Sequence, residues 1–108
     1  SVDSLASIAW LHTKEIYYWG DIDTHGFSIL SRLRGYFPKA KALMMDELTL
    51  KQLSHLCIKE PEKSRCTHML RHLTVSEKML YQQLQLDHQR LEQERVPMQH
   101  IVKILRQL

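Results

Sequence analysis

The stretch from Glu15 to Asp46 constrains the fold more than any other part of this 108-residue chain. The segment Glu15–Trp19, "EIYYW", is short and rich in β-branched and aromatic residues, which predicts a strand. Its unbroken apolar character predicts burial on both faces, as in a parallel sheet. Apolar residues then recur at helical spacing up to Pro38, which ends the helix, and Ala40–Asp46 is typical of a second strand. The stretch therefore predicts a strand–helix–strand crossover.

Helical patterns surround this unit. One amphipathic pattern covers Val2–His12, and another short helix is predicted at Thr49–Leu56. Residues 57–73 hold a proline and clustered charge, and we expect a loop or linker there. The chain is therefore predicted to have an α/β core over residues 1–56 and a helical part over residues 74–108 that packs on it.

The C-terminal part carries the clearest local signal. Thr74 and Glu77 form a capping-box pattern, and the string "TVSEKMLYQQLQLDHQRLEQER" that they open predicts one long helix. Pro97 separates this helix from a last amphipathic one over Met98–Leu108. Residues 74–108 are therefore expected to form helices that pack on the core.

Composition narrows the functional classes. The net charge of +3 is compatible with nucleic-acid binding without demonstrating it. The sequence has no run of eighteen apolar residues, so no membrane span is expected. Two cysteines and the absence of a signal-peptide pattern favour a reducing cytoplasm. We expect a cytoplasmic globular protein.

Two carboxylates one residue apart follow the first predicted strand. On an extended segment, Asp21 and Asp23 point to the same side and Ile22 to the other. One interpretation is structural: Asp21 forms a turn, and Asp23 or Thr24 caps the next helix. The other is a metal site, since Mg²⁺ prefers carboxylate oxygens and the helix N-terminus favours a phosphate. Spacing alone leaves both interpretations open.

Longer strings around the acidic pair resemble a known family. "GDIDTHGFSILSRLRGYFP" resembles the D-x-D segment of Toprim domains, as found in topoisomerase VI A subunits and the related meiotic double-strand-break protein. "YYWGDIDTHGFSILSRLR", with "LMMDELTL" and "RLEQERVP", is closer still to the C-terminal domain of JetD, the nuclease subunit of the Wadjet anti-plasmid defence system. This resemblance covers the chain from about Trp10 to Val96.

The resemblance implies a partial Toprim-like parallel sheet with flanking helices and a DNA endonuclease activity that depends on Mg²⁺ or Mn²⁺. Asp21 and Asp23 match the acidic pair that binds metal beside the scissile phosphate, and Gly26 matches the glycine that follows. The family also uses a glutamate on an earlier strand, which we expect upstream of Ser1. These 108 residues alone are therefore expected to bind metal weakly and to cleave nothing.

The partners implied by the resemblance are double-stranded plasmid DNA, the SMC-like JetABC complex and a second copy of the chain. Two other functions remain open. One is a topoisomerase VI A-like DNA-cleaving subunit, which needs a tyrosine-bearing domain. The other is a non-catalytic Toprim-like module that binds DNA or a partner protein.

Several further residues are candidates for the same site. Asp46 is either a supplementary metal ligand or, as we favour, a helix cap acting on Thr49. Glu92 and Glu94 either face the active site or lie on a solvated charged face. The remaining candidates are basic residues that either contact DNA phosphates or form solvated surface: His25, Arg32, Arg34 and Lys39.

Overall fold

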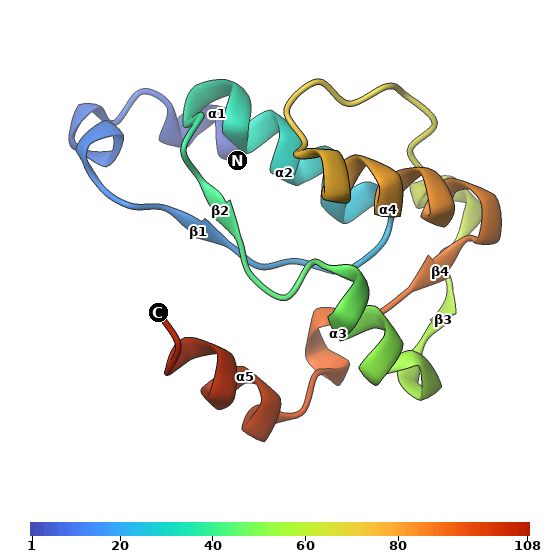
Figure 1. Cartoon of the computed structure of the whole chain (residues 1–108). Helices are drawn as coiled ribbons and strands as arrows, with labels where there is room; N and C mark the ends of the chain where they lie inside the picture. Colours follow the sequence, from blue (N-terminus) through green and yellow to red (C-terminus); the bar gives the residue numbers. More distant parts are fainter.

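Two short parallel strands joined by a long helix form the first half of the fold in the computed structural model, which describes all 108 residues (Figure 1). The elements are β1 (Tyr17–Tyr18), α2 (Thr24–Tyr36) and β2 (Lys41–Ala42). Tyr17 pairs with Lys41, and Tyr18 pairs with Ala42. The predicted order of strand, helix and parallel strand is therefore confirmed.

The strands are shorter and more exposed than predicted. β1 pairs with β2 and with no other strand, and no residue from Glu15 to Trp19 is buried. The side chain of Tyr17 remains 38% exposed. The expected burial of Glu15–Trp19 on both faces is therefore wrong.

The predicted N-terminal helix is broken into two turns. α1 covers Val2–Leu5, and a 3₁₀ turn, η1, covers Ala9–Thr13. Between them the Ser7 hydroxyl donates a hydrogen bond to the Ser4 carbonyl at 2.8 Å, a local bond that competes with helix propagation. α1 is held to α2 by the Tyr36 hydroxyl, which donates to the Asp3 carboxylate at 2.8 Å.

A second sheet, absent from the sequence-based prediction, joins the linker region to the end of the long helix. β3 (Ile58–Lys59) pairs antiparallel with β4 (Gln89–Arg90), and a 3₁₀ turn, η3, follows at Glu62–Ser64. The predicted helix continuing to Arg95 instead ends at Asp87, because His88 adopts a left-handed conformation with φ of 60°. A further 3₁₀ turn, η4, covers Gln93–Arg95.

Helix starts follow the local sequence signals. α3 covers Glu47–Gln52 and leads into a 3₁₀ turn, η2, at Ser54–Leu56. α4 covers Val75–Asp87, and its predicted capping box is confirmed: Thr74 and Glu77 exchange side-chain and backbone bonds. α5 covers Met98–Leu105 and begins directly after Pro97.

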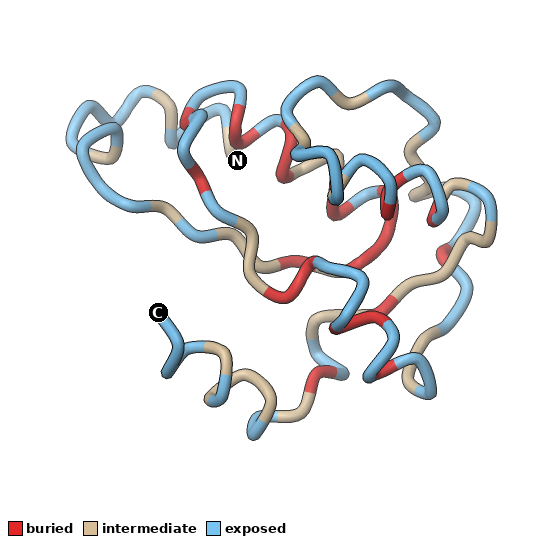
Figure 2. The backbone as a smooth tube through the Cα atoms, viewed as in Figure 1, coloured by how far each residue is buried: buried red, intermediate tan, exposed pale blue.

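The main apolar core lies where α2 and α4 meet the acidic turn. Phe27 and Leu30 of α2 and Leu84 of α4 are fully buried, and Ile22 is 1% exposed. Residues 22–24 are all buried (Figure 2). α5 contributes only partly buried side chains, Ile101 and Ile104, to this core. No helix of the chain has the length and apolar character needed to cross a membrane.

Candidate metal centre

The acidic turn is an extended segment fixed by the C-terminal part of the chain. The amide of Ile22 donates to the Leu91 carbonyl at 2.9 Å, and the amide of Leu91 donates back to Ile22 at 3.0 Å. The Ile22 side chain is buried in the core. Because side chains alternate along an extended segment, Asp21 and Asp23 project together from the other side. The turn thus has the geometry expected of a paired-carboxylate site.

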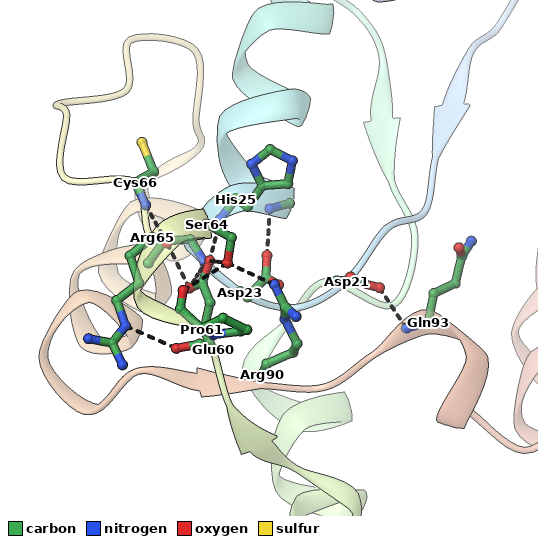
Figure 3. A network of polar contacts seen from close by, with 12 residues as sticks. Asp21, Asp23, His25, Glu60, Pro61, Ser64, Arg65, Cys66, Arg90 and Gln93 are labelled. Carbon is green, nitrogen blue, oxygen red and sulfur yellow. Dashed lines mark hydrogen bonds and ion pairs between the residues drawn. The ribbon is translucent and has the colours of Figure 1, made fainter.

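Asp23 is engaged at both carboxylate oxygens (Figure 3). Oδ1 accepts the Gly26 amide at 2.6 Å, which makes Asp23 the N-cap of α2. Oδ2 accepts Arg90 Nε at 2.6 Å, and the Asp23 side chain is fully buried. Burial raises the pKa of Asp23, and the bonds from Gly26 and Arg90 oppose that rise without cancelling it. The capping interpretation of this residue is therefore confirmed, with Asp23 rather than Thr24 as the cap.

Asp21 is more accessible than Asp23. Its Oδ1 atom accepts the backbone amide of Gln93 at 2.8 Å, and no hydrogen bond or ion pair engages Oδ2. Gln93 in turn donates from Nε2 to the Trp19 carbonyl at 3.0 Å, which docks η4 onto the turn. Burial, followed by the negative charges of Asp21 and Asp23, raises the pKa of nearby Tyr18 to about 12. Asp21 thus has one carboxylate oxygen, Oδ2, without a protein partner.

A third carboxylate, Glu60, lies at the same helix end and was missed in the sequence. Its side chain is fully buried. Oε1 accepts the amide of Thr24 at 3.1 Å and the Thr24 hydroxyl at 2.7 Å, while Oε2 accepts the amide of His25 at 3.3 Å and the Ser64 hydroxyl at 3.3 Å. No motif marks Glu60 in the sequence, since its role depends on the fold bringing β3 to the start of α2.

Together, Glu60 and Asp23 occupy the first three amides of α2, those of Thr24, His25 and Gly26. These are the groups that an anion would use at a helix N-terminus. The predicted attraction of a phosphate to this helix end is therefore wrong, because carboxylates of the chain itself already satisfy it.

Gly26 allows the turn to close on the helix. A Cβ atom at this position would collide with the backbone carbonyl of Asp21, and backbone atoms cannot move aside as a flexible side chain can. The glycine is thus required by close approach rather than by its backbone dihedral angles.

The other predicted site residues do not converge on the pair. Asp46 caps α3 by accepting the Thr49 amide at 2.8 Å, which confirms the favoured capping interpretation. Glu92 is half-buried and Glu94 is exposed, and no hydrogen bond or ion pair engages either carboxylate. None of Asp46, Glu92 and Glu94 therefore adds a third metal-binding carboxylate to Asp21 and Asp23.

The predicted DNA-contacting residues divide into exposed and buried ones. His25, Arg32 and Lys39 are exposed. Arg34 is buried, and its guanidinium donates to both carboxylate oxygens of Glu77 and to the Ala40 carbonyl. Arg34 therefore holds α2 to α4, and its guanidinium is not available to bind a phosphate.

The chain by itself does not complete a magnesium site. Mg²⁺ demands near-octahedral oxygen coordination, and no group of three or more histidine, cysteine, aspartate or glutamate side chains is placed to hold a metal ion. Asp23 is fully buried, and its Oδ1 and Oδ2 atoms already accept hydrogen bonds from Gly26 and Arg90. The donor set of these residues therefore fits one carboxylate contact, through Asp21, rather than a whole site.

A protein-family model described as Wadjet protein JetD, C-terminal, matches residues 1–105. The match spans nearly the whole chain and confirms the resemblance to the C-terminal domain of JetD. No curated protein matches the chain.

Proposed function

Because the chain belongs to the family described as Wadjet protein JetD, C-terminal, we propose that it is part of a Wadjet-system enzyme that cleaves plasmid DNA. The enzyme is a Toprim-type endonuclease that uses Mg²⁺ or Mn²⁺, and these residues supply the acidic half of its centre. Its partners are double-stranded DNA and the JetABC complex, and a second copy of the chain is a further candidate partner.

The observation that carries this proposal is the unpartnered Oδ2 atom of Asp21, which lies just after the carboxyl end of β1. In open α/β sheets, ligands bind beyond the carboxyl ends of the strands. Asp21 is held there by the Gln93 amide through one oxygen only, so its second oxygen is available to a metal ion.

Asp23 is assigned a different part in the same centre. Its bonds to the Gly26 amide and Arg90 hold the turn in shape, and it joins the metal site only if Arg90 is displaced. We expect the remaining ligands, including the family's glutamate, outside residues 1–108. A metal would polarise the phosphate, whereas the residues described here position the turn that meets it.

A non-catalytic binding module is the second candidate function. The engagement of both Asp23 oxygens favours it, since a carboxylate that serves as helix cap and ion-pair partner has a sufficient structural role. The two functions differ in what they require of Asp21, which has no comparable structural role.

The test is plasmid cleavage by the protein assembled with the other Wadjet components. Asp21→Asn keeps the acceptor for the Gln93 amide but removes the charge. We expect cleavage to fall by about 100-fold or more, since even partners behind the metal ligands are worth about 10–100-fold. Glu47→Gln is the matched control, because Glu47 is exposed and pairs only with Lys51 on the same helix. Undiminished cleavage by the Asp21 variant would refute Asp21 as a metal ligand, whereas a wild-type protein that binds DNA or a partner but never cleaves would support the binding module instead.

A further inference from the structure

A basic cavity of about 950 Å³ lies between α2, the residues 64–72 and α1. The charged side chains that line it are Arg32, Arg65, Arg71 and Asp3, so its formal charge is +2 (three arginines less one aspartate) with its histidines neutral. His25, His68 and His72 also line it. The cavity is thus lined by three arginines and only one acidic residue.

The cationic groups in this cavity are largely free to bind a ligand. Arg71 makes no hydrogen bond or ion pair and is exposed. Arg65 uses only Nε, which donates to the Glu60 carbonyl at 3.0 Å, and its two terminal nitrogens have no protein partner. Arg32 lies 3.9 Å from Asp3, and both side chains are more than half exposed, so their attraction is weak. Guanidinium groups of this kind suit phosphate oxygens.

One end of the cavity lies beside the residues that cap α2. His25 and Ser64 line its wall, and both are bonded to Glu60, which caps α2 beside Asp23 (Figure 3). A second basic cavity, with Lys14, Lys39 and Lys41 opposed by Glu15, lies at the other end of α2. It carries lysines rather than arginines, and no residue of the acidic turn lines it.

The length of the cavity suits a nucleic-acid strand. The face of α2 that lines it runs from His25 to Tyr36, which spans about 16 Å at about 1.5 Å per residue. Along the duplex axis, one strand of B-DNA presents a phosphate about every 3.4 Å, and successive phosphates of that strand lie farther apart than this because the strand winds around the axis. The helix face is therefore long enough to follow a short run of phosphates on one strand.

We propose that this cavity binds the sugar–phosphate backbone of DNA and directs it toward the acidic turn. The identity of the ligand as DNA rests on the proposed function, whereas the phosphate chemistry rests on the free arginines. Binding here does not require a metal ion, because no carboxylate of the acidic turn lines the cavity.

The test measures binding of a fluorescent DNA duplex to the full protein by anisotropy, in EDTA, across a range of salt concentrations. The slope of log K against log salt is negative, and each lost phosphate contact reduces its magnitude by about 0.9. The double variant Arg32→Gln/Arg71→Gln is expected to reduce that magnitude by about 1.8, on the same principle. Both side chains are exposed, so the variant should fold, which circular dichroism checks. Lys103→Gln on α5, also exposed, should leave the slope unchanged.

The outcomes separate this proposal from the cleavage proposal. A wild-type slope in the double variant would overturn it, as would a loss confined to Lys39→Gln in the other basic cavity. Absence of DNA binding by the wild type, or binding of inorganic phosphate alone, would also overturn it. Asp21→Asn should retain binding in EDTA, so a protein that binds through the arginines but never cleaves would refute only the nuclease function.

Discussion

Glu60 should control the stability of the start of α2, and replacing it tests the described site directly. Glu60→Gln keeps the size of the side chain but removes its charge. The two bonds from Thr24, at 3.1 Å and 2.7 Å, then change from charge-assisted to neutral. Such a change is worth about 1 kcal/mol per bond, or about 2 kcal/mol for both.

Two smaller effects act in opposite directions. If the glutamine oxygen faces Thr24, its NH₂ group faces the His25 amide, and that bond, now 3.3 Å long, is lost. Against this, the variant removes a negative charge that raises the pKa of the neighbouring Asp23. We take these to offset, and expect local opening to become easier by about 2 kcal/mol, or about 30-fold.

The assay is native-state hydrogen exchange of the amides of Thr24, His25 and Gly26, which reports local opening. We expect exchange about 30-fold faster in Glu60→Gln, the rate factor equivalent to about 2 kcal/mol. Glu62→Gln is the matched control, because Glu62 is two residues away, exposed, and makes no side-chain bond. If the Glu60 variant exchanges at the rate of the control, the buried Glu60 carboxylate does not hold the start of α2.

Two further predictions concern stability. Gly26→Ala should lower the urea midpoint by the equivalent of about 2–3 kcal/mol, which is typical of overpacking. The control Gly35→Ala, whose Cβ would meet only His72 at 3.6 Å, should raise the midpoint by the equivalent of about 0.5–1 kcal/mol through helix propensity. Equal effects of the two variants would contradict the close approach at Gly26. Burial acts to raise the pKa of Glu77, but the bonds from Arg34 and Thr74 outweigh it and leave that pKa below the ordinary value of a glutamate. The Glu77 carboxylate therefore stabilises the fold fully at pH values above that ordinary value, and progressively less as the pH falls through its folded pKa. Glu77→Gln should remove this part of the acid dependence in pH-resolved urea unfolding, and an unchanged profile would argue against the Arg34 pair.

The sequence predicts those parts of the fold that local signals specify. The capping box at Thr74 and Glu77 lies within one turn of chain, and Pro38 and Pro97 mark helix boundaries wherever they occur. The alternation of Asp21, Ile22 and Asp23 follows from extended geometry alone. These features needed no knowledge of distant residues.

What was missed depends on pairing across long separations. β3 and β4 have two residues each, too few to show alternation, and their partners lie about thirty residues apart. Glu60 and Arg90 are ordinary charged residues until the fold brings them to Asp23. The site was therefore predictable as an acidic pair, but the groups that occupy its oxygens were not.

The pairing of Ile22 with Leu91 also has a consequence for biosynthesis. The acidic turn is closed by a contact that spans most of the chain, and such contacts form late because a long loop must close first. A nascent chain that does not yet contain residues 90–93 leaves Asp23 without its arginine and Asp21 without its anchoring amide. The paired carboxylates can therefore take their final arrangement only after partners that follow them by 67 and 72 residues have been made.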